Sequence, residues 1–143
     1  MILCDVNLLY ATVRSFPQHS QAKAWLAERL AGDPPLALAH VALFGFVRIV
    51  TNRRIFDRPR SVDEALADVQ SWLDAGAVLV TPGPRHLELA FGLLRDLGTA
   101  GNLTTDIQLA ALAIEHQAEM HSADADFARM KGLRWLNPLA PAA

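Results

Sequence analysis

Short apolar runs alternate along the chain with longer segments in which apolar residues recur every three or four positions. The short runs predict β-strands, at residues 2–4, 36–39, 77–80, 119–122 and 134–136. The longer segments predict helices, at residues 6–13, 20–30, 40–50, 61–74, 85–97 and from 104 onward, with a short last helix ending near residue 131. Strands that alternate with helices indicate a parallel sheet with helices on both faces, an α/β fold.

Several helix ends carry recognisable signals. Ser61 followed by Glu64 predicts a capping box, and Gly76 predicts the end of that helix. Thr104 or Thr105 can cap the helix that follows, because a hydroxyl oxygen accepts from free N–H groups in the first turn. Helical spacing predicts a core-facing side for helix 61–74, made of Ala65, Leu66, Val69, Trp72 and Leu73.

Helix 40–50 is apolar apart from His40 and Arg48, so we expect it to lie in the core. Arg48 can reach a phosphate or pair with a carboxylate, and both readings stay open. The loop at residues 51–60 contains four arginines, which can follow a nucleic-acid backbone while Phe56 offers a stacking face. Alternatively, the loop is an ordinary solvated connection and Phe56 packs into the core.

Acidic residues occur where the predicted strands and helices meet. Asp5 follows the first strand, Asp106 lies in the first turn of a helix, and Asp124 and Asp126 follow the fourth strand. Because parallel α/β sheets bind ligands at the carboxyl ends of their strands, we expect these acids to converge. Carboxylates without histidine or cysteine favour hard cations, so the sequence predicts a Mg²⁺ or Mn²⁺ site.

A plainer interpretation of the same residues is available. Aspartate is a common helix cap, which alone would explain Asp5 and Asp106, and it is a common turn residue after a strand, which would explain Asp124.

Composition narrows the class of protein. The chain has 143 residues, 52% of them hydrophobic, which suits a single domain spanning residues 1–143. No apolar run is long enough to cross a membrane, and the first residues do not resemble a signal peptide. The single cysteine, Cys4, excludes an intramolecular disulfide, so we expect a cytoplasmic protein. A net charge of −2 excludes binding of nucleic acid through bulk positive charge.

Four segments resemble the PIN-domain ribonucleases, specifically the VapC-type toxins of bacterial toxin–antitoxin pairs: LCDVNLLYA, GFVRIVTNRRIF, TTDIQLAALAIEH and HSADADFARMKGL. The resemblance covers nearly the whole chain and keeps the order of the motifs. It implies a three-layer α/β/α fold around a parallel sheet and a Mg²⁺- or Mn²⁺-dependent endoribonuclease acting on tRNA or ribosomal RNA. It also implies a homodimer and a cognate VapB-like antitoxin that blocks the acidic site.

Position by position, the resemblance assigns the first acid to Asp5, the third to Asp106 and the fourth to Asp124, with Asp126 competing for the last assignment. These four residues are the candidate metal ligands, and the first three are the candidate catalytic residues. Ser122 and Thr105 would orient the carboxylates through hydrogen bonds.

The chain departs from the family at the second acid, usually a glutamate, where it has Gly45. Water or another side chain, such as Asn7, would then replace the missing ligand. This departure motivates an alternative, a degenerate PIN domain that binds RNA or antitoxin without cutting. A phosphatase-like hydrolase is a third hypothesis, but the expected DxD pair after the first strand is absent, since the chain has Asp5-Val6-Asn7.

Overall fold

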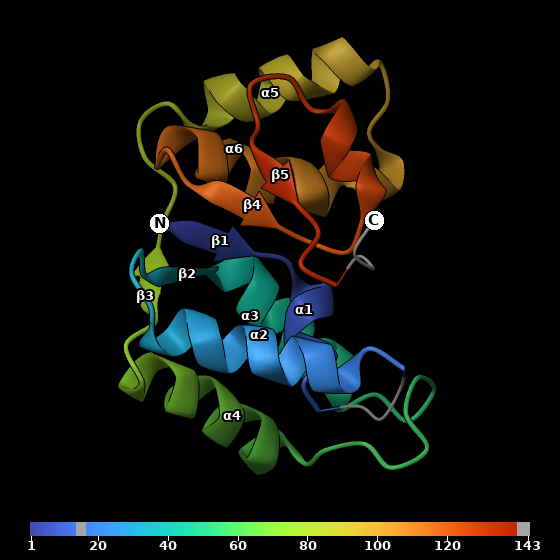
Figure 1. The fold of residues 1–143 in the computed structure, drawn as a ribbon. Helices are drawn as coiled ribbons and strands as arrows, with labels where there is room; N and C mark the ends of the chain where they lie inside the picture. The colour runs from blue at the N-terminus through green and yellow to red at the C-terminus, as the bar shows by residue number, and fades with distance from the viewer. Residues whose placement is uncertain (14–16, 140–143) are drawn as a thin grey trace.

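The computed structural model describes residues 1–13 and 17–139, which form a five-stranded, fully parallel sheet in the order β3-β2-β1-β4-β5 (Figure 1). The strands are β1 (Ile2–Cys4), β2 (Leu36–Ala39), β3 (Val78–Val80), β4 (Glu119–His121) and β5 (Trp135–Leu136). The α-helices are α1 (Val6–Tyr10), α2 (His19–Ala31), α3 (His40–Val50), α4 (Val62–Asp74), α5 (His86–Leu97) and α6 (Thr104–Glu115). Two short 3₁₀ helices, η1 (Gly101–Leu103) and η2 (Ala125–Arg129), precede α6 and follow β4.

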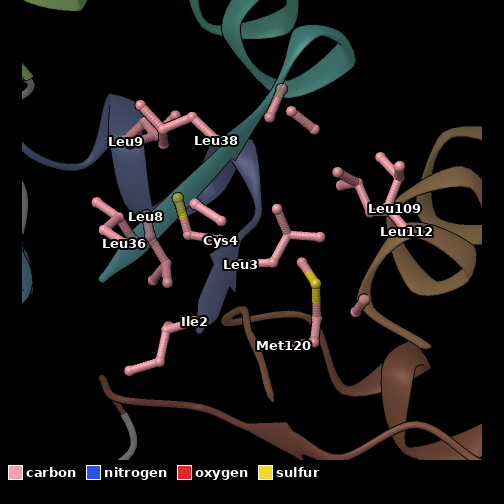
Figure 2. Packing of buried hydrophobic residues seen from close by; sticks show 14 of the residues in the cluster. Ile2, Leu3, Cys4, Leu8, Leu9, Leu36, Leu38, Leu109, Leu112 and Met120 are labelled. Atoms are coloured by element: carbon pink, nitrogen blue, oxygen red, sulfur yellow. The ribbon is translucent and has the colours of Figure 1, made fainter. Parts of the chain in front are cut away.

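Side-chain alternation along the strands separates the two faces of the sheet. Leu3 of β1 and Met120 of β4 are paired in register and point toward α6, where Leu109 and Leu112 lie (Figure 2). Ile2 and Cys4 point to the opposite face, together with Leu8, Leu9, Leu36 and Leu38. All ten of these side chains are buried, so helices cover both faces, as the three-layer prediction requires.

Helix α2 packs on the face opposite α6. Trp25 of α2 donates from Nε1 to Nδ1 of His121, which is in register with Cys4 on β1. Glu119 Oε1 lies 2.7 Å from the other ring nitrogen of His121, so Nδ1 is the acceptor and Nε2 carries the proton. Burial lowers the pKa of His121, which keeps the imidazole neutral at the centre of this contact.

Several predicted boundaries are confirmed. Ser61 accepts from the Glu64 N–H, and the Glu64 side chain accepts from the Ser61 N–H, which completes the capping box of α4. Gly98 ends α5 with a φ of 70°, a left-handed conformation that glycine adopts without strain.

Three local predictions are wrong. Neither Thr104 nor Thr105 caps α6, because the helix begins at Thr104 itself and the Thr104 hydroxyl donates to the Gly101 carbonyl. Helix α3 is not wholly in the core, since Phe44 is 74% exposed on its outer side. Leu66 of α4 is 51% exposed, because α4 covers the edge of the structure with a narrower face than its apolar sequence suggested.

Among the described residues there is no helix with the length and hydrophobicity needed to cross a bilayer.

Candidate metal centre

Four aspartates gather at the carboxyl ends of β1 and β4, the two central neighbouring strands. Asp5 directly follows β1, and Ser122 directly follows β4, which is paired with β1 through to its last residue. Asp124 and Asp126 lie at the start of η2, just beyond Ser122. Asp106 comes from the first turn of α6. The parallel sheet therefore converts three distant sequence segments into one acidic edge.

Asp5 is a buried carboxylate held on both oxygens, and only 4% of its surface is exposed. Oδ1 accepts from the Val6 N–H at 2.7 Å, which makes Asp5 the N-cap of α1 as the plainer interpretation held. Oδ2 accepts from the Ser122 hydroxyl at 2.8 Å and from Asn7 Nδ2 at 3.2 Å. Asp5 is therefore both the N-cap of α1 and a member of the acidic group.

The Ser122 hydroxyl connects the two strand ends. Besides donating to Asp5, it accepts from Asn7 Nδ2 at 3.1 Å and from the Asp124 N–H at 3.0 Å. Asn7 Oδ1 accepts from the Ala123 N–H at 3.2 Å. Asn7 thus turns its amide nitrogen toward Asp5 and uses its oxygen to hold the β4–η2 loop. The prediction that Asn7 replaces a missing ligand does not agree with this orientation.

Three of the aspartates come close enough to hold one ion. One carboxylate oxygen from each of Asp106, Asp124 and Asp126 lies within 4.8 Å of the others. Asp124 Oδ1 also accepts from the Asp126 N–H at 2.9 Å, so the loop itself sets the spacing of these two side chains. Hard oxygen donors converging without nitrogen or sulfur suit Mg²⁺ or Mn²⁺, so the residues fit the predicted cation.

Mutual repulsion is visible in the protonation behaviour of the carboxyls. Burial, and then the charges of Asp5, Asp124 and Asp126, raise the pKa of Asp106 from 3.8 to about 7. Burial also raises the pKa of Asp5, and the charge of Asp124 adds to this, while hydrogen bonds from Ser122 and Val6 oppose it. A cation between these carboxylates would offset their repulsion and so favour the ionised form of Asp106.

Gly45 lies on α3 beside Val6, the residue that follows Asp5. A Cβ added there would lie 3.4 Å from Val6 Cγ2, an ordinary van der Waals contact. The missing second acid is therefore not excluded by crowding around its first side-chain carbon.

The arginines of the 51–60 loop have mixed roles. Arg60 makes a bidentate ion pair with Asp68, with N–O distances of 2.6 and 2.8 Å, so this side chain is committed to α4. Phe56 is buried, which contradicts the stacking interpretation and agrees with packing into the core. Arg48 is exposed and has no ion pair among the described residues.

The sequence interpretation missed Arg129, which extends from η2 toward the acidic cluster. Its Nη1 lies 3.6 Å from Asp126 Oδ1. The available signal was the i,i+3 spacing of opposite charges, which places both side chains on one side of a helical turn.

Comparison with known proteins agrees with this architecture. The family profile described as PIN domain matches residues 2–133. Ribonuclease VapC33 of Mycobacterium tuberculosis is 50% identical over 141 residues, covering 97% of this chain and 99% of that protein. Ribonuclease VapC37 of the same species is 41% identical over 142 residues, covering 98% and 99%.

Solved structures show the same fold at low identity. The VapBC2 complex of Rickettsia felis bound to a promoter DNA fragment superposes with a TM-score of 0.71, at 18% identity, over 96% of this chain and 98% of that one. VapC20 of Mycobacterium tuberculosis, a toxin that cleaves the sarcin–ricin loop, gives 0.69 at 16% identity, over 94% and 99%. From its sequence, its parallel sheet and its acidic edge, the chain belongs to the PIN-domain family and, within it, to the VapC ribonucleases.

Proposed function

We propose that this chain is the toxin of a VapBC-type toxin–antitoxin pair, a Mg²⁺- or Mn²⁺-dependent endoribonuclease that hydrolyses RNA phosphodiester bonds. The observation that carries the proposal is the approach of Asp106, Asp124 and Asp126 to within 4.8 Å. Relatives up to half identical over their whole length bear the name ribonuclease.

The four carboxylates would have different roles, because their surroundings differ. Asp106, Asp124 and Asp126 are half-buried and would hold the ion from one side. Asp5 is buried, and its oxygens accept hydrogen bonds from Val6, Ser122 and Asn7. It would therefore form the rigid, buried side of the site. A bound Mg²⁺ or Mn²⁺ supplies an acidified water for attack on phosphorus and offsets charge on the transferring oxygens.

Ser122 would act by orientation, because its hydroxyl is engaged by Asp5, Asn7 and Asp124. This agrees with the orienting role expected from the sequence.

One alternative has a specific observation in its favour. Gly45 stands where the family has its second acid, which would suit a module that binds RNA or antitoxin without cutting. The two functions differ in one measurement, since only the nuclease loses a cleavage activity when Asp5 is replaced by asparagine.

The proposed partners are a VapB-like antitoxin and a structured RNA, either tRNA or ribosomal RNA. The antitoxin is supported by structural neighbours solved as VapBC complexes, from Rickettsia felis and from nontypeable Haemophilus influenzae. We place the reaction in the cytoplasm, because Cys4, the one cysteine, is buried and unpaired, which suits a reducing compartment.

We further propose a homodimer formed through the apolar face made by Phe44, Leu87 and Phe91. Leu87 and Phe91 are four residues apart on α5 and are 63% and 48% exposed. They border a cavity of about 520 Å³ between α5 and α6. His40 and Val41 at the start of α3 line a second cavity together with His86. Phe44, further along α3, is 74% exposed. Phe91→Glu should convert the dimer to a monomer in light scattering, whereas Val62→Glu on α4 should not.

The nuclease proposal is tested by calorimetric titration of the wild type and of Asp106→Asn with Mn²⁺, followed by incubation with total RNA. We expect saturable binding that the variant loses, and cuts at a few defined sites. Binding without cleavage would favour the non-cutting module. No Mn²⁺ binding at all would mean that the aspartates only cap helices and form turns.

A further inference from the structure

Electrostatic repulsion poses a problem for RNA at the acidic edge. Asp5, Asp106, Asp124 and Asp126 carry four negative charges when ionised, and one divalent cation offsets two of them. A phosphodiester brings a further negative charge, so its approach requires a cation from the protein close to the metal site.

Arg129 is the cation that the fold places there. Its Nη1 lies 3.6 Å from Asp126 Oδ1, and Asp126 belongs to the group of three aspartates that can hold the ion. Among the ion pairs of the described residues, this one alone involves the acidic cluster. We propose that Arg129 binds the phosphate of the RNA beside the scissile bond, an inference that rests on the proposed nuclease function.

The state of the Arg129 side chain supports this role. At 3.6 Å the contact with Asp126 is longer than a hydrogen bond, and the side chains are 54% and 44% exposed. A guanidinium has five N–H donors in a planar fork that matches two phosphate oxygens. Arg129 therefore contacts the cluster while about half of its side chain stays open to solvent, from which the RNA must arrive.

A second cation follows Arg129 along the chain. Lys131 is exposed two residues further on and is bound in no ion pair among residues 1–13 and 17–139. By contrast, Arg60 of the basic loop is held by Asp68 at 2.6 Å and is not available for phosphate. Of these cations, Arg129 is the one with a contact to the acidic cluster.

The simpler role for Arg129 is that of a surface ion pair that steadies η2. Such a pair would affect folding and the metal affinity of Asp126, but it would leave the salt dependence of RNA binding unchanged. The two roles therefore differ in a quantity that can be measured directly.

The experiment measures RNA binding by fluorescence anisotropy, with a short labelled single-stranded RNA and saturating Mn²⁺. All proteins carry Asp5→Asn so that the RNA is not consumed, and KCl is varied from about 50 to about 200 mM. We expect Arg129→Gln to weaken binding about tenfold. The slope of log affinity against log salt should fall by about 0.7, the value for one phosphate contact on a single strand. Arg129→Lys should keep the slope.

Arg85→Gln is the matched control. The Arg85 N–H donates to Glu115 at the far end of α6, about 14 Å along the helix from Asp106 at about 1.5 Å per residue. An Arg129→Gln protein with unchanged RNA affinity and salt slope, but altered Mn²⁺ affinity, would overturn the inference and leave Arg129 as a counter-ion of Asp126. Loss of Mn²⁺ binding in the wild type would instead refute the nuclease proposal, so the two failures are distinguishable.

Discussion

The Ser122 hydroxyl donates a 2.8 Å hydrogen bond to Asp5 Oδ2 and so ties the end of β4 to the end of β1. The same oxygen accepts from the Asp124 N–H, which positions the first residue of the acidic loop. Ser122→Ala should therefore lower Mn²⁺ affinity by about 10- to 100-fold, the usual effect of removing a group that orients metal ligands. Calorimetry measures this, with Ser71→Ala on the exposed side of α4 as control. Unchanged affinity in Ser122→Ala would contradict the orienting role.

Asp106 predicts a pH dependence of the metal-free chain. Its pKa is about 7 in the folded state against 3.8 ordinarily, so the folded state binds more protons between these values. The protonated Asp106 carboxyl therefore stabilises the folded state fully below about pH 4, and this contribution is lost as pH rises through about 7. At pH 8 the free energy of unfolding of Asp106→Asn should consequently exceed that of wild type by about 1–2 kcal/mol. This figure allows for the half-exposed position of the side chain. Urea unfolding with EDTA at pH 5 and pH 8 checks this, and an equal difference at both pH values would refute it.

Gly45→Glu should add metal-binding capacity. The first side-chain carbon fits beside Val6, and replacement of a helical glycine favours α3. We expect the Mn²⁺ stoichiometry in calorimetry to rise from one ion toward two, because a further carboxylate then faces the acidic edge. Gly45→Gln separates the charge from the added bulk and should keep the wild-type stoichiometry. A single ion in both variants would show that the α3 position does not reach the site.

A side chain at Gly83 should disturb its contact with Glu115. Its N–H donates to Glu115 Oε1 at 2.8 Å, and an added Cβ would lie 2.5 Å from Oε2 of the same carboxylate. Gly83→Ala should lower the melting temperature, because the Glu115 carboxylate that accepts from the Gly83 and Arg85 N–H groups must shift. Gly92→Ala on α5, where the added carbon meets nothing within 4 Å, should be neutral or stabilising. Thermal melts of the two variants give the comparison, and equal melting temperatures would contradict it.

Local patterns anticipated the elements well where local physics decides them. Strand β2 and helix α3 have the predicted bounds. The short apolar run of the strand ends at Ala39, and the helical segment begins at His40. The α4 capping box was predicted from Ser61 and Glu64, since both hydrogen bonds form within one turn. The Thr104 cap failed because η1 precedes α6, and the hydroxyl finds the Gly101 carbonyl instead.

In the candidate site, too, some features follow from the sequence alone and others only from the tertiary structure. The sequence by itself determined the α/β class, the family and the placement of Asp5, Asp106 and Asp124 at the ends of elements, because each depends on periodicity or on a local motif. Tertiary structure decided which atoms meet. Strand order β3-β2-β1-β4-β5 puts β1 beside β4, and only then does Ser122 reach Asp5 and Asn7 across more than a hundred residues. Packing also decided that Phe56 is buried and that Arg60 of the basic loop is held by Asp68 of α4. Such contacts follow from the arrangement of elements in space, which no local pattern contains.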